Sequence, residues 1–262
     1  MIMDNLRLYG KAPFRIAVLH GGPGAPGEMA PVARELARER GVLEPLQTAD
    51  TLKGQVQELR EVLETHADPP VTLIGWSWGA WLGYILTARY PALVSKLILV
   101  GCPPFEDRSV AQIQSTRLGR LTKDQRRELE DITAALEDPS TKDPDALLDR
   151  FGKIMSKADS CNPLPDDAEG MPVQLNINQS VWSAAAAMRS SGKLLELGKQ
   201  IRCPVVAIHG DYDSHPAEGV QKPLTSVLKD FRFILLPQCG HAPWREKEAR
   251  GLFFGYLLKE IE

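Results

Sequence analysis

Residues 70–86, PVTLIGWSWGAWLGYIL, join a compact apolar run directly to a run with helical spacing. The first part predicts a buried strand, and residues 78–90 predict a helix with large side chains on one side. Because no linker separates the two, the chain must reverse sharply at Ser77. Gly75 and Gly79 suit such a reversal, since the backbone there comes too close for a Cβ atom. This junction restricts the chain to folds in which a strand feeds straight into a helix.

The same alternation recurs along much of the chain. Further apolar runs predict strands at 15–20, 41–47, 96–101, 203–210 and 231–237, and amphipathic patterns predict helices near 28–40, 54–66 and 245–260. Strands that alternate with helices are typical of βαβ units. We therefore expect an α/β fold with a mostly parallel central sheet and helices on both faces.

Residues 103–200 break this alternation. They hold helical patterns but no clear strand, and the stretch that begins LTKDQ opens with a Thr122–Gln125 capping box. A crossover between parallel strands needs only about a dozen residues. We therefore predict a helical lid inserted at 103–200, with a core made of residues 1–102 and 201–262.

Composition excludes several classes of protein. Hydrophobic residues make up 43% and charged residues 25% of 262, with a net charge of −3 and no basic cluster. Neither nucleic acid nor a membrane surface is an expected partner, and no apolar run approaches the roughly 20 residues of a membrane helix. The four cysteines are far apart, which favours a cytoplasmic protein with no metal centre. We expect no cofactor; the sequence leaves the oligomeric state open.

A serine hydroxyl needs a positioned base to act as a nucleophile. Of the five histidines, His241 lies in a loop just past the last predicted strand, at the same sheet edge as Ser77. His215, four residues beyond another strand, is the second candidate. His209 falls within a strand pattern and is expected in the core, while His66 ends a surface helix.

The base in turn needs a carboxylate that fixes its tautomer. The stretch HGDYDSHP offers Asp211 and Asp213 directly after a strand. Aspartate is also common in turns, so one of the two is expected to be a turn residue. The pattern alone does not choose between them.

Four segments resemble the α/β-hydrolase-fold superfamily of the serine-nucleophile type: HGGPG, GWSWG, HGDYD and GHAPWRE. The resemblance covers nearly the full chain and has the order serine, acid, histidine. It implies Ser77 as nucleophile, Asp213 as the acid with Asp211 left as a turn residue, and His241 as the base. It also implies an oxyanion hole from the amides of Trp78 and Gly22. Glu246 matches a glutamate frequent in such proteins.

The chain departs from the superfamily pattern in places. Only 19 residues precede His20, so the N-terminal hairpin is expected to be shortened, with NLRLY as a single short remnant. HGGPG resembles the proline iminopeptidases, but their elbow usually reads Gly-Gly-Ser-Trp-Gly, and their loop pattern after the second strand is missing. These departures weaken the peptidase assignment.

We therefore predict a serine hydrolase that cleaves an ester- or amide-type bond of a small molecule through Ser77, His241 and Asp213. The alternatives are a proline iminopeptidase-like aminopeptidase and a non-catalytic ligand receptor of the same fold. Trp182 is expected to line an apolar acyl pocket together with Trp78. Trp76 is equally well explained by core packing.

Overall fold

The structure is a computed structural model that describes residues 2–3, 5–165 and 170–262. Within these residues one sheet of eight strands has the order β1-β2-β4-β3-β5-β6-β7-β8. The strands are β1 (Ile2–Met3), β2 (Leu6–Tyr9), β3 (Phe14–Leu19), β4 (Gly41–Pro45), β5 (Val71–Trp76), β6 (Val94–Val100), β7 (Val205–Gly210) and β8 (Phe231–Leu236). All pairings from β4 to β8 are parallel, and β1 and β2 add an antiparallel edge. The predicted mostly parallel α/β fold is confirmed.

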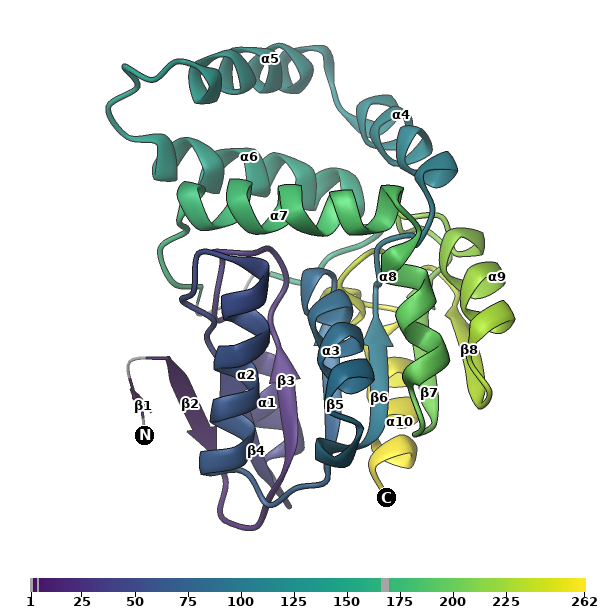
Figure 1. Cartoon of the computed structure of the whole chain (residues 1–262). Coiled ribbons are helices and arrows are strands. Elements are labelled where there is room, and N and C mark those ends of the chain that lie inside the picture. The colour runs from purple at the N-terminus through teal and green to yellow at the C-terminus, as the bar shows by residue number, and fades with distance from the viewer. Residues whose placement is uncertain (1, 4, 166–169) are drawn as a thin grey trace.

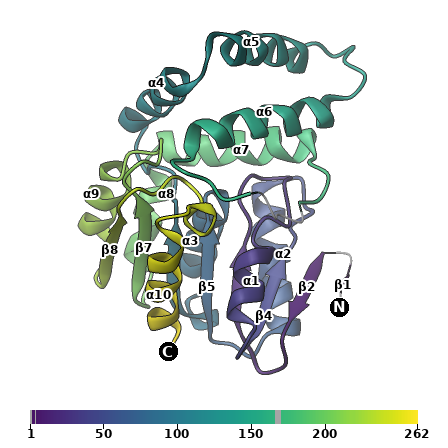
Figure 2. The same cartoon turned by 180° about the vertical axis from the view of Figure 1, so that it is seen from behind.

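Helices cover both faces of the sheet, as Figures 1 and 2 show from opposite sides. One face carries α2 (Leu52–His66), α3 (Trp78–Arg89), α8 (Lys193–Glu196) and α9 (Glu218–Val227), whose apolar residues join one core. The other carries α1 (Ala30–Leu36) and α10 (Arg250–Ile261), which enclose a second core. The strands between these layers are apolar on both faces, which explains their continuous apolar runs.

Three predicted elements differ in extent from those observed. Helix α1 spans only 30–36 because Gly27, with φ of +94°, keeps the preceding residues in a turn and β4 begins at Gly41. The last helix begins at Arg250, after a 3₁₀ turn at 243–245. The shortened N-terminal hairpin consists of two strands, β1 and β2, where a single remnant was expected.

The segment between β6 and β7 is helical where it is described. It contains α4 (Val110–Arg120), α5 (Lys123–Glu137), α6 (Pro144–Asp159) and α7 (Leu175–Ser190), which lie across one end of the sheet (Figure 1). The predicted capping box at Thr122 and Gln125 is present. Leu129, Ile132 and Ile154 form part of a small apolar cluster of this segment, whereas Ile177 and Val181 of α7 join the main core. Among the described helices, none is both long and apolar enough to cross a bilayer.

Candidate active site

Ser77 occupies a strained turn between β5 and α3. Its φ of 52° and ψ of −118° lie where non-glycine residues are rare. A Cβ on Gly75 would lie 2.2 Å from the carbonyl oxygen of Gly79, and one on Gly79 would lie 2.5 Å from that of Leu19. The two glycines are therefore required for α3 to start so close to the sheet. The serine backbone is fixed in turn by a 2.9 Å hydrogen bond from its N–H to the Val100 carbonyl.

His241 and Asp213 come from loops that follow β8 and β7, and the structure brings them together. The Nδ1 atom of His241 lies 2.8 Å from Oδ2 of Asp213. The Trp76 indole N–H donates to the His241 carbonyl oxygen at 2.9 Å. A Cβ on Gly101 would lie 3.1 Å from Nδ1 of His241. The loop of His241 therefore contacts Trp76, which directly precedes Ser77. It also contacts Gly101, which follows Val100, the residue that accepts the Ser77 backbone hydrogen bond.

Within the described residues the Ser77 hydroxyl makes no hydrogen bond to the His241 ring, which bonds through Nδ1 to Asp213. Hydrogen bonds of this kind are often long before a substrate binds. The structure nevertheless places the His241 loop beside the strained turn at Ser77.

The structure also separates the two candidate carboxylates. Asp213 is buried and bonds to imidazole groups. Asp211 is exposed, and its Oδ1 accepts a 3.2 Å hydrogen bond from the Cys239 backbone N–H, which ties two loops together. Asp211 therefore serves as the expected turn residue.

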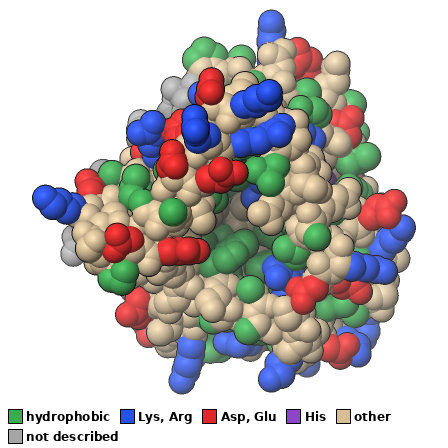
Figure 3. Space-filling model, turned by 90° about the horizontal axis from the view of Figure 1, so that it is seen from above, with side chains coloured by type: hydrophobic (Ala, Val, Ile, Leu, Met, Phe, Trp, Pro, Cys, Tyr) green, Lys and Arg blue, Asp and Glu red, His purple; other side chains and the backbone are tan. Residues whose placement is uncertain are grey.

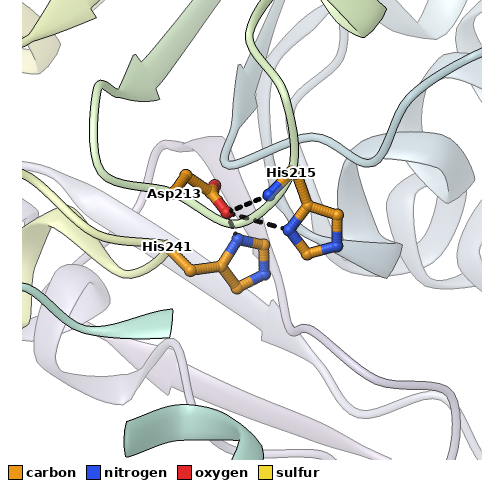
Figure 4. A group of neighbouring side chains, drawn as sticks. All are labelled: Asp213, His215 and His241. Carbon is orange, nitrogen blue, oxygen red and sulfur yellow. Dashed lines mark hydrogen bonds and ion pairs between the residues drawn. The ribbon is translucent and has the colours of Figure 1, made fainter. Parts of the chain in front are cut away.

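Asp213 holds a second imidazole in addition to His241 (Figure 4). Both the backbone N–H and the ring Nδ1 of His215 lie 2.9 Å from its Oδ1. The His215 and His241 rings stack, with centroids 4.4 Å apart and planes 26° from parallel. His209, buried in β7 as expected, has Nε2 2.8 Å from the His215 carbonyl oxygen and 3.5 Å from Oδ2 of Asp213.

Burial and charge together set the ionisation of this group. Burial would raise the pKa of Asp213, but the neighbouring imidazoles outweigh it and hold that pKa well below its usual value. Burial would lower the pKa of His241, yet the charge of Asp213 raises it above the usual 6.5. For His215 burial dominates and lowers the pKa to about 4. His241 is therefore the better proton acceptor of the two.

Asp213, His215 and His241 are also the described side chains that could jointly ligate a metal ion, with one donor atom of each within 4.8 Å of the others. A metal binds an imidazole nitrogen in the plane of the ring. The stacked rings have nearly parallel planes, so their lone pairs do not converge on one point. The arrangement fits two hydrogen bonds to a carboxylate better than it fits metal ligation.

The two predicted oxyanion donors lie beside the elbow. Trp78 is the first residue of α3, where backbone N–H groups have no partner within the helix. Gly22 has φ of +54° in the turn after β3. The neighbouring Gly21 packs against the Trp76 ring, since a Cβ there would lie 2.5 Å from it. The turn after β3 and the start of α3 lie close together, since a Cβ on Gly79 would also lie 2.6 Å from the His20 carbonyl oxygen.

Trp182 of α7 lies over the start of α3. Its ring stacks on Trp81 with centroids 5.5 Å apart and meets Trp78 edge-on at 6.4 Å. It keeps 36% of its surface exposed. From the side of α4–α7 the molecule is hollowed, with hydrophobic side chains at the floor and charged ones around the rim (Figure 3).

Sequence reasoning missed a buried polar connection between the helical segment and the site. Asp159, at the end of α6, binds Arg117 of α4 through both oxygens at 2.8 and 2.6 Å. It also accepts from the Ser214 hydroxyl at 2.5 Å, and its carbonyl accepts from the His241 N–H at 2.9 Å. No local pattern marks Asp159, because its partners are distant in the sequence.

Glu246 makes a second connection of this kind. Its carboxylate accepts from the backbone N–H groups of Cys161, Asn162 and Gly240 at 2.9, 2.7 and 3.1 Å. It thereby joins the end of α6 to the loop that carries His241. The resemblance pointed to this residue, and the structure supplies the contacts.

Residues 16–251 match the alpha/beta hydrolase family, so the chain belongs to that family and the resemblance seen in the sequence is confirmed. Among curated relatives, it is 24% identical over 237 residues to a pimeloyl-[acyl-carrier protein] methyl ester esterase of Aromatoleum aromaticum, covering 87% of this chain and 91% of that one. It is 22% identical over 196 residues to the biotin biosynthesis bifunctional protein BioHC of Teredinibacter turnerae. That match covers 74% of this chain but 33% of the relative, so the chain spans about a third of its length.

Solved structures agree with the fold. The structure of VinJ superposes with a TM-score of 0.67 at 18% identity, covering 98% of this chain and 93% of VinJ. A proline iminopeptidase from Mycobacterium smegmatis superposes with a TM-score of 0.62 at 19% identity, covering 98% and 95%. At these identities the comparison establishes the common fold.

Proposed function

We propose that this protein is a serine hydrolase that cleaves an ester- or amide-type bond of a small molecule, with Ser77 as nucleophile, His241 as base and Asp213 as the acid that orients it. The observation that carries the proposal is the 2.8 Å contact between His241 and Asp213 beside the strained turn at Ser77. An esterase among the relatives supports the ester class.

In the first step the Ser77 oxygen attacks the substrate carbonyl while His241 Nε2 takes the hydroxyl proton. The ionised Asp213 stabilises the imidazolium through Nδ1. The amides of Trp78 and Gly22 donate to the oxyanion, each contributing on the order of 3 kcal/mol in comparable sites. His241 then returns the proton to the leaving group, which departs and leaves an acyl-enzyme.

In the second step water attacks the acyl carbon as His241 again takes a proton. The tetrahedral intermediate collapses, the bond to Ser77 breaks, and the serine regains its proton from His241. The serine is thus regenerated without any group beyond the chain and water.

We further infer that residues 103–200 form the predicted lid and that the substrate enters beneath it. The position of Trp182 over the start of α3 supports an apolar acyl pocket beside α7, and the hollow on this side of the molecule has hydrophobic side chains at its floor (Figure 3). Apolar stacking residues of this type bind acyl chains through buried area.

A fluorophosphonate probe tests the proposal directly. It should label the wild-type protein at Ser77, and Ser77→Ala should remain unlabelled while its circular dichroism spectrum is unchanged. Untreated wild-type protein should hydrolyse members of a panel of esters, thioesters and aminoacyl amides, and labelling with the probe should abolish that turnover. Folded wild-type protein that neither reacts with the probe nor turns over the panel would support a ligand receptor instead, and turnover of prolyl amides alone would support the iminopeptidase alternative.

A further inference from the structure

The turn that carries Gly22 is covered by the segment that leads into α7. The backbone N–H groups of Met171 and Gln174 donate to the carbonyl oxygens of Pro26 and Gly24 at 3.1 and 2.8 Å. A Cβ on Gly24 would lie 2.5 Å from the Gln174 carbonyl oxygen, so the two backbones meet without room for a side chain. This turn is therefore built directly against the helical segment.

The residues from Gly22 onward form a β-turn whose type depends on its central peptide. The Ala25 N–H donates to the Gly22 carbonyl oxygen at 3.0 Å, and Gly24 has φ of +71°. Proline followed by a glycine with positive φ is the pattern of a type II turn. In that type the central peptide, whose oxygen belongs to Pro23, is turned over relative to the commoner type I. A group that binds this oxygen therefore holds the turn in its observed form.

Asn178 of α7 supplies that group. Its side-chain N–H donates to the Pro23 carbonyl oxygen at 3.0 Å. Pro23 is buried, whereas Gly22 keeps part of its surface exposed. A buried carbonyl without a partner is costly, so the Asn178 amide stabilises this orientation of the central peptide. The hydrogen bond thus secures the buried part of the turn and leaves Gly22 on its accessible part.

The same helix also contacts the residue that carries the second predicted oxyanion donor. Trp182 follows Asn178 by four positions in α7, so the two side chains lie on one face of the helix. The Trp182 ring meets the Trp78 ring edge-on, with centroids 6.4 Å apart. Helix α7 therefore contacts both segments from which the oxyanion hole is predicted to form, the turn at Gly22 and the start of α3.

We propose that Asn178 is a positioning residue for the oxyanion hole. Its amide holds the type II turn through the Pro23 carbonyl oxygen, and the turn in turn fixes the direction of the Gly22 N–H. Asn178 acts through the backbone and takes no part in bond making or proton transfer. This role rests on the proposed function, because it requires a tetrahedral oxyanion that the Gly22 amide stabilises.

Replacing the substrate's carbonyl oxygen by sulfur separates this role from a general effect on the fold. Sulfur accepts hydrogen bonds only weakly, so a thionoester gains little from the oxyanion donors. A misdirected Gly22 amide should therefore slow the reaction of an ester and leave that of the matching thionoester nearly unchanged. Disturbed packing around Ser77 or His241 would slow both substrates alike.

Two variants test the role through the ratio of kcat/KM for the best ester of the panel to kcat/KM for its thionoester. Asn178→Leu removes the amide at similar volume, and Asn178→Asp keeps the shape but replaces the donor by an oxygen that repels the Pro23 carbonyl. Each should lower the ratio about tenfold, a part of the loss of about a hundredfold or more that removal of a whole donor causes. Asn176→Leu is the matched control, because Asn176 is exposed on the same helix, and its ratio should equal that of the wild type.

Circular dichroism establishes that each variant is folded, and the isosteric Asn178→Asp decides the question if Asn178→Leu does not fold. A wild-type ratio in a folded Asn178 variant, or equal losses on ester and thionoester, would overturn the positioning role and leave the proposed function intact. A wild-type protein that turns over neither substrate and does not react with the fluorophosphonate would instead overturn the proposed function and this role with it.

Discussion

The sheet core and the helical segment α4–α7 are held together by different means. In the core, α3 buries every residue from Trp78 to Ala88, whereas α4 buries none of its residues and α5 buries only Leu129 and Ile132. The helical segment is tied to the core by polar contacts of Asp159 and Glu246 and by the packing of α7. The sheet core thus carries the proposed catalytic residues, and the helical segment reaches their loops through a small number of polar contacts.

The largest effect is expected from the two aspartates that follow β7 in the sheet core. Asp213→Asn should lower kcat/KM about 10,000-fold, because the amide favours the wrong imidazole tautomer. Asp211→Asn should have far less effect, since the Asp211 carboxylate is exposed and accepts a hydrogen bond from the Cys239 backbone N–H, which an amide oxygen can also accept. Steady-state assays on the best ester of the panel measure both. The reverse ranking would mean that the wrong carboxylate has been assigned.

The sheet core should also prove more tightly packed than the helical segment. Leu99→Ala, at a fully buried position of β6, should lower the free energy of unfolding by about 3 kcal/mol, while Leu129→Ala in the helical segment should cost nearer 2 kcal/mol because its small cluster can relax. Urea unfolding gives both values. Equal costs with a single transition for both variants would argue that the helical segment is as tightly packed as the sheet.

The polar contacts between the two regions should affect the pH dependence of kcat/KM. His241 must be neutral to accept a proton, and its pKa is raised above 6.5, so kcat/KM should fall as the pH drops through a value above 6.5. The negative charge of Asp159 contributes to this rise and the positive charge of Arg117 opposes it. Asp159→Asn should therefore move the acid limb to lower pH, and Arg117→Met should move it to higher pH.

Opposite shifts would be difficult to explain by a general loosening of the helical segment, which would move both variants the same way. Arg150→Met is the matched control, because its partner Glu128 also lies in this segment but the pair is exposed and remote from His241. Its acid limb should coincide with that of the wild type. If the acid limb moved in the same direction in both test variants, this would contradict an electrostatic effect of Asp159 on His241.

The smallest expected effect concerns substrate contact. Trp182→Ala should raise KM several-fold for long acyl chains and change kcat little, because its ring contacts the rings of Trp81 and Trp78 and is proposed to add apolar area to the acyl pocket. Trp182→Phe should recover most of the affinity. A loss confined to kcat would place Trp182 among the positioning residues instead.

The sequence by itself determined the class of fold and most of its elements. Strand and helix periodicity depends on neighbouring residues, so β5, α3 and the capping box at Thr122 were readable from local patterns. The Gly75–Gly79 spacing likewise reflects a local steric need at the turn. Where local and tertiary influences compete, as at the ends of α1 and α10, the predicted limits were too wide.

Only the tertiary structure decided how the polar groups are partnered. Asp211 and Asp213 are equivalent in local pattern, and burial beside three imidazoles distinguishes them. The stacking of His215 on His241 and the contact of Asp159 with Ser214 join residues 26 and 55 positions apart in the chain. Such contacts arise from how loops meet at one edge of the sheet, and hydrogen bonding between distant side chains leaves no periodic trace in the sequence.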